Sequence, residues 1–77
     1  MSNEPVVDWD ATFKKGVRTQ DGQDAGIVVG VSSGYVIVQK GVTRELLIPK
    51  HKVEGFDGNE LTLSIPKQDL KKYEMKI

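Results

Sequence analysis

The sequence predicts a small all-β domain: an antiparallel barrel or curled sheet of five or six short strands, followed by a short C-terminal helical segment. Short stretches rich in β-branched and aromatic residues recur along the chain, glycine-containing turns separate them, and the pattern changes only after Pro66. Several short strands with turn signals between them are typical of all-β barrels and sandwiches. A chain of 77 residues can build one core and no second one.

Six segments have the composition of strands. They cover residues 16–19, 25–32, 35–39, 44–48, 53–56 and 60–65. The last of them alternates polar and apolar residues, which places Leu61, Leu63 and Ile65 on one buried face. Pro49 ends the fourth segment, because proline cannot donate a hydrogen bond to a strand ladder.

Glycines separate and bend these strands. The Asp-Gly pairs at 21–22 and 57–58 predict tight turns, since glycine accepts a positive φ and aspartate bonds the following backbone. Gly26 and Gly30 interrupt the second strand, where glycines mark bulges or bends that curl a small sheet. Their spacing fits neither the dinucleotide fingerprint nor a phosphate-binding loop, because no Gly-Lys-Ser/Thr follows.

The two ends of the chain have their own patterns. We assign residues 1–10 to an N-terminal arm and residues 11–77 to the single domain. The arm carries Val6 and Trp9 among polar residues. Two interpretations of Trp9 stand: it folds back and caps one end of the core, or it packs on a partner, because tryptophan is favoured at interface hot spots.

The segment after Pro66 contains good helix formers, and proline suits a first helical turn. Leu70, Tyr73 and Ile77 fall on one possible helical stripe. We expect a short helix or 3₁₀ turn that packs over an open end of the barrel. The alternative is a frayed tail.

The charges balance, with 11 Lys and Arg against 11 Asp and Glu, so the strongly basic field of a typical nucleic-acid binder is missing. Scattered, solvated lysines are one interpretation, and a local basic face is the other. Such a face would use Lys14, Lys15 and Arg18, or Lys40, Arg44, Lys50 and Lys52.

The chain contains no cysteine, which excludes disulfides, thiolate metal sites and a thiol nucleophile. Its longest apolar runs, such as residues 27–29 and 36–38, are far shorter than the roughly 20 residues that a spanning helix needs. Glu4 stands where a signal peptide would carry basic residues. We expect a cytoplasmic protein with no membrane insertion.

Residues suited to catalysis are few. A hydrolytic triad needs a nucleophile, a base and an orienting group. The chain has one histidine, His51, which lies between two lysines and is expected to be a solvated loop residue. Acid pairs fall in the arm or in turns, and residues 57–60 lack the length and acidic spacing of an EF-hand. We expect no enzymatic activity, no cofactor, no metal site and no small-molecule substrate.

Residues 15–63 resemble the PRC-barrel superfamily. The matching features are Gly16-Val17 before Asp21-Gly22, the run from Gly26 to Val31, Leu47-Ile48-Pro49, Val53 with Phe56-Asp57-Gly58, and the alternating Leu61-Thr62-Leu63. Two features depart from the family pattern. In the family an acid often follows the apolar run of the second strand, but Val31-Ser32 stand there in this chain. The segment between Ser33 and Gly41 is also shorter than in many members. The resemblance implies a small PRC-type, SH3-like barrel.

The resemblance also implies an interaction module, because PRC-barrel domains serve in reaction-centre H subunits, in a ribosome-maturation factor and, in some archaeal stand-alone versions, in cell division. We expect a non-enzymatic adaptor that forms a homodimer and docks onto a larger assembly, such as archaeal-type cell-division machinery. The alternative is an RNA- or ribosome-associated barrel that acts in ribosome maturation. The candidate partner-binding residues are Val6, Trp9, Tyr35 and Phe56.

Overall fold

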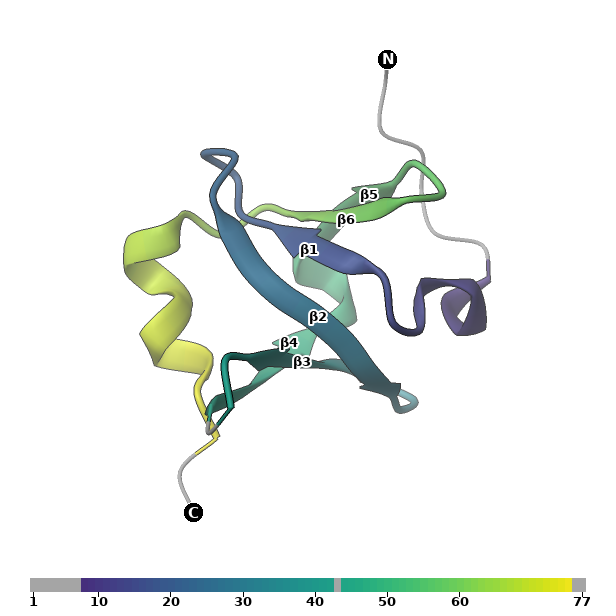
Figure 1. Cartoon of the computed structure of the whole chain (residues 1–77), viewed down its shortest axis with the longest axis horizontal. Helices are drawn as coiled ribbons and strands as arrows, with labels where there is room; N and C mark the ends of the chain where they lie inside the picture. The colour runs from purple at the N-terminus through teal and green to yellow at the C-terminus, as the bar shows by residue number, and fades with distance from the viewer. Residues whose placement is uncertain (1–7, 43, 76–77) are drawn as a thin grey trace.

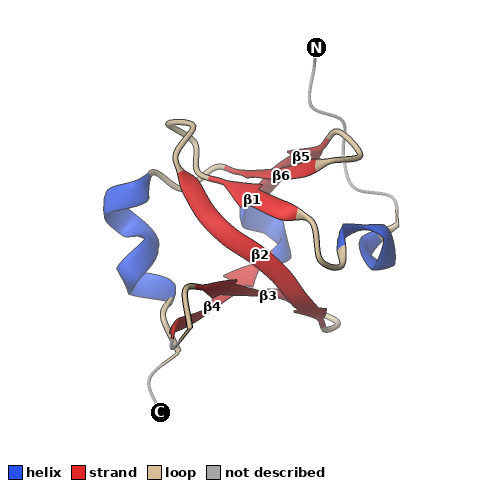
Figure 2. Cartoon of the chain, in the orientation of Figure 1, coloured by secondary structure: helices blue, strands red, loops and turns tan. Residues whose placement is uncertain are grey.

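The computed structural model describes residues 8–42 and 44–75 and contains six strands and three short 3₁₀ helices in these ranges. The strands are β1 (Gly16–Arg18), β2 (Asp24–Val31), β3 (Tyr35–Lys40), β4 (Arg44–Pro49), β5 (Val53–Phe56) and β6 (Glu60–Leu63). The helices are η1 (Trp9–Thr12), η2 (Lys50–Lys52) and η3 (Lys67–Tyr73), drawn in blue in Figure 2. The prediction of an all-β fold with a C-terminal helical segment is confirmed.

All six strands belong to one curled sheet with the order β4-β3-β2-β1-β6-β5. In Figure 1, β2 runs diagonally across the front and joins β1, β6 and β5 above to β3 and β4 below. The neighbours pair antiparallel, as predicted, except β1 and β6, which pair in parallel with Val17 opposite Leu61. Parallel neighbours need a long crossover, and here the whole chain between these two strands provides it.

Two bulges bend β2, at the positions where the glycines predicted them. The register of the β1–β2 pair shifts next to Gly26. The register of the β2–β3 pair shifts between Val28 and Gly30. Gly26 has a φ of +118°, and a Cβ built on it would lie 2.3 Å from the carbonyl oxygen of Gln39. The backbones of β2 and β3 therefore approach each other so closely at this bulge that only glycine fits.

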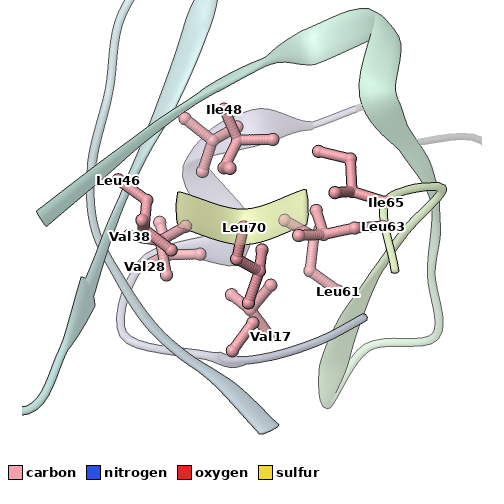
Figure 3. Packing of buried hydrophobic residues seen from close by; sticks show 11 residues of the cluster. Val17, Val28, Val38, Leu46, Ile48, Leu61, Leu63, Ile65 and Leu70 are labelled. Atoms are coloured by element: carbon pink, nitrogen blue, oxygen red, sulfur yellow. The ribbon is translucent and has the colours of Figure 1, made fainter. Parts of the chain in front are cut away.

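The core lies inside the curl and is filled from the strands and from η3. Figure 3 shows these side chains gathered around a common centre. They are Val17, Ala25, Val28, Val36, Val38, Leu46, Ile48, Leu61, Leu63, Ile65 and Leu70. The predicted buried alternation of Leu61, Leu63 and Ile65 is confirmed. Two threonines are also fully buried, and both are satisfied by hydrogen bonds close by: Thr12 Oγ1 donates to the carbonyl of Trp9, and Thr19 Oγ1 donates to Asp21.

The helices η1 and η3 stand at opposite sides of the sheet in Figure 1. Leu70 of η3 inserts into the core and Tyr73 packs against it, so the helical alternative for this segment is confirmed. Ile77, the third residue of the predicted stripe, lies outside the described residues. After η3 the chain runs along the outer edge of β4, where the Met75 amide donates to the Glu45 carbonyl at 2.7 Å.

The sequence did not predict η1, which includes two residues that we assigned to the arm. Asp8 caps it by accepting a hydrogen bond from the Asp10 amide. Trp9 is half-buried and packs against the core, as the first of its two interpretations expects, and part of its surface stays accessible. The Nζ atom of Lys50 lies 5.0 Å from the centroid of the Trp9 ring, within reach of a cation–π interaction.

Candidate functional site

The outside of the sheet carries an apolar surface over three neighbouring strands. In β3, Val36 and Val38 are completely buried, so the alternation of the strand turns Tyr35 and Ile37 outward. The same alternation turns Leu47 outward in β4, and Ile27 and Val29 in β2. We call these five residues the outer apolar face.

The strand register joins the outer apolar face into one patch. Ile37 lies opposite Leu47 on one side and opposite Gly30 on the other, and its side chain covers that glycine. Ile27 and Tyr35 are each about half exposed, at 50% and 47%. A shallow hollow of about 480 Å³ adjoins the patch, with Ile27 and Val29 in its wall. Apolar patches of this kind mark interaction sites more often than single exposed residues do.

The four predicted partner-binding residues are not brought together. Tyr35 lies on the outer apolar face, where its ring is exposed. Trp9 and Phe56 instead pack against the core, and part of the surface of each stays accessible to solvent. Val6 lies outside the described residues. Of the four, Tyr35 is therefore the one that belongs to the surface with the most exposed apolar groups.

Sequence reasoning missed most of the outer apolar face. The signal was present in residues 27–29 and 36–38, which are apolar at every position. Successive strand residues point to opposite sides, so an uninterrupted apolar run must place apolar groups on both faces of a sheet. Both runs lie within the predicted strands 25–32 and 35–39, so the apolar second face of these strands follows from the same residues.

A second candidate site is a cavity of about 520 Å³ between the β3–β4 end of the sheet and η3, open to solvent on one side. We call it the basic pocket. It is lined by Asp21, Lys40, Arg44, Leu46, Lys67, Gln68, Leu70, Lys71 and Glu74. Two leucines, four cationic residues, two acids and one glutamine thus share this wall. The hydrocarbon stems of the long cationic side chains extend the apolar surface.

Asp21 holds the turn between β1 and β2 against the start of η3. Its carboxylate accepts hydrogen bonds from the Thr19 hydroxyl and from the Lys67 amide, the latter at 3.2 Å. The Thr19 hydroxyl is the main reason that the pKa of Asp21 lies below its ordinary value. Desolvation of the carboxylate opposes this lowering, and the Lys67 amide and the Lys67 charge lower the pKa further by smaller amounts. Asp21 therefore stays ionised at neutral pH and serves a structural role.

The cations are grouped differently from either predicted basic face. Arg18 forms an ion pair with Glu60 at 2.9 Å, and Lys50 lies over the Trp9 ring. Lys40 and Arg44 do share a site, but they share it with Lys67 and Lys71 of the C-terminal segment. The sequence could not reveal this grouping, because it depends on where η3 packs.

Groups for catalysis or metal binding are sparse in the part of the chain that the structure describes. His51 is exposed in η2, and no hydrogen bond joins it to a described hydroxyl or carboxylate. Within residues 8–42 and 44–75, no three His, Asp or Glu side chains gather where they could hold a metal ion. None of the described helices is long and apolar enough to cross a membrane.

Comparisons of this chain with protein-family models, with curated proteins and with solved structures gave no match. The resemblance to the PRC-barrel superfamily therefore stays a prediction from the sequence motifs. The six-stranded curled sheet shows an all-β fold and does not assign a family, so function has to be argued from the surfaces themselves.

Proposed function

We propose that this protein is a non-enzymatic protein-interaction module that pairs with a second copy of itself through the outer apolar face. The observation that carries the proposal is the exposure of Ile27, Val29 and Tyr35 beside Ile37 and Leu47 on one continuous surface. Burying such side chains against a partner removes apolar area from water, at roughly 25 cal/mol for each Å².

The size of the domain supports self-pairing. A chain of 77 residues hides only about 60% of the surface that it exposes when unfolded, so its own core contributes modest stability. Pairing hides more apolar surface. A face made of aliphatic and aromatic groups can also be buried against a copy of itself in a two-fold interface without any matching of opposite charges.

Docking onto a larger assembly is the second part of the proposal. It is supported by the PRC-barrel resemblance, which suggests an assembly such as archaeal-type cell-division machinery. Trp9 and Phe56 keep part of their surface accessible outside the outer apolar face, and aromatic residues are favoured as interface anchors. These two residues, together with Val6 of the arm, are the proposed contacts with that assembly.

Sedimentation equilibrium of the full chain tests the self-pairing. The wild-type protein is expected at twice the monomer mass of 8.5 kDa at micromolar concentration. Ile27→Lys places a charge within the proposed interface and is expected to weaken pairing by at least about tenfold, because an unpaired charge is costly to bury. Ile27 is half exposed, so the variant monomer keeps its core.

Val42→Lys is the matched control. It makes the same type of change at a side chain that is 91% exposed in the β3–β4 turn and is not one of the five residues of the outer apolar face. The control is expected to pair like the wild type. A wild-type mass near 8.5 kDa at every concentration, or equal weakening by both variants, would contradict self-pairing through this face. Capture of RNA with a tagged chain would favour the ribosome-associated alternative.

A further inference from the structure

The basic pocket has no part in the proposed self-pairing, yet it concentrates positive charge. Its four cations are Lys40, Arg44, Lys67 and Lys71, and its two carboxylates are those of Asp21 and Glu74. This excess of cations lies on a protein whose formal net charge is zero.

The cations of the basic pocket are not neutralised by ion pairs within the described residues. The ion pairs found there join Arg18 to Glu60 and Lys72 to Asp69, away from the pocket wall. Lys40 Nζ donates to a neutral group, the carbonyl of Asp24, at 2.9 Å. The Asp21 carboxylate is already occupied by the Thr19 hydroxyl and the Lys67 amide. The remaining hydrogen-bond donors of these cations can therefore serve an anion.

Two of these cations lie directly opposite each other across a strand pair. Lys40 and Arg44 are partners in the β3–β4 ladder, and both line the pocket. Like charges directly opposite on one face of a sheet destabilise the strand pairing. An anion bound between the two cations would offset that repulsion and so stabilise the pairing of β3 with β4.

The pocket wall also contains two apolar residues. Leu46 and Leu70 line it, and each also belongs to the buried core, with 2% and 6% of its surface exposed. These leucines are fixed by packing, so this part of the wall is pre-formed. A cavity of about 520 Å³ has the size of a small-molecule site, for which the usual range is about 300–1,000 Å³.

We infer that the basic pocket binds a small amphipathic carboxylate, with its apolar chain against Leu46, Leu70 and the hydrocarbon stems of the long cationic side chains, and its carboxylate among Arg44, Lys71 and their neighbours. Arg44 offers a planar guanidinium that can hold a carboxylate through two parallel hydrogen bonds, and the lysines add compact positive charges. The inference does not depend on self-pairing, because the pocket lies within one copy of the chain.

Isothermal titration calorimetry and amide chemical-shift mapping on the full chain test this inference, with octanoate as the probe. Octanoate is expected to bind and to shift the amide signals of Leu46 and Leu70. Affinity is expected to rise from butanoate to hexanoate to octanoate by up to about fourfold for each methylene that is buried. Octanol lacks the charge and acetate lacks the chain, and each is expected to bind at least about tenfold more weakly.

Two pairs of variants distinguish binding in the pocket from general electrostatic attraction between octanoate and the charge of the whole protein. Arg44→Gln with Lys71→Gln removes two pocket cations and is expected to weaken octanoate binding by at least about tenfold. Lys14→Gln with Lys72→Gln makes the same change in net charge on exposed side chains outside the pocket wall, one of them on η3 itself, and is expected to leave the affinity unchanged.

Each variant is expected to fold, because all four substituted side chains are exposed. Circular dichroism checks this. Three results would overturn the inference: no binding of octanoate, equal binding of octanol, or equal weakening in both pairs of variants. Self-pairing is measured by sedimentation without any ligand, and therefore its failure would leave these titrations interpretable.

Discussion

Replacing Gly26 by alanine tests whether the bulge in β2 depends on the close approach of β3. The backbone there has a φ of +118°, which costs an L-residue about 1–3 kcal/mol. The new Cβ would lie 2.3 Å from the backbone oxygen of Gln39, and relieving such a contact by moving packed backbone costs about 1–3 kcal/mol more. The lower entropy of the unfolded alanine chain offsets about 0.4–1 kcal/mol of this.

The net expectation is a loss of about 1–6 kcal/mol, out of a total free energy of unfolding of about 4–12 kcal/mol for a domain of this length. Urea unfolding followed by the fluorescence of Trp9, the chain's one tryptophan, measures it. The urea midpoint should fall by about 1–6 M, because a chain of this size has a slope near 1 kcal/mol per M.

Gly34→Ala is the control for the Gly26 substitution. Gly34 lies outside the positive-φ region, and a Cβ added there meets no heavy atom within 4 Å. This variant is expected to stay within about 0.5 kcal/mol of the wild type. If Gly26→Ala were equally mild, the contact with β3 would not constrain the bulge, and our explanation of the curl would be wrong.

Two further predictions concern the core and the response to acid. Leu61→Ala should cost about 2–5 kcal/mol in urea unfolding, because Leu61 is fully buried, whereas Leu47→Ala on the outer face should cost less than half as much. Asp21 and Asp57 have pKa values below the ordinary value, mainly because of the Thr19 hydroxyl and the Glu60 amide respectively. Their contribution to stability is complete above the unfolded pKa of about 3.9 and is lost as the pH falls through the lower folded values. Exchanging both for asparagine should therefore flatten the loss of stability between pH 6 and pH 2; an unchanged pH profile would show that other groups control acid unfolding.

Much of the fold could be predicted because its signals are local. Each Asp-Gly pair fixes a turn through its own backbone, and at the second of them Asp57 Oδ1 accepts from the amides of Asn59 and Glu60, both at 2.8 Å. The alternation around Leu61 and Leu63 likewise reports which side of β6 is buried. These features depend on residues that are close in sequence.

The candidate sites could be predicted less well, because they combine residues that are distant in sequence. The basic pocket joins Lys40 and Arg44 with Lys71. The packing of Leu70 into the core and the Met75–Glu45 hydrogen bond hold the C-terminal segment beside β4. The outer apolar face needs the strand order to place Ile27, Ile37 and Leu47 on adjacent strands. Trp9 was predicted better, since it packs against the core, as the first of its two interpretations expects.

The parallel pairing of β1 with β6 has a consequence for how the protein folds. Gly16 lies opposite Glu60, so the ladder at the middle of the sheet joins positions separated by 44 residues (60 − 16). The hairpins β2–β3, β3–β4 and β5–β6 can each form from neighbouring sequence, but they stay two separate halves until this long loop closes. Closing it costs chain entropy before any contact compensates for it, which places folding on a millisecond-to-second time scale. Until then both β1 and β6 present an open edge, and a second chain that supplies the missing strand could exchange β5 and β6 between molecules.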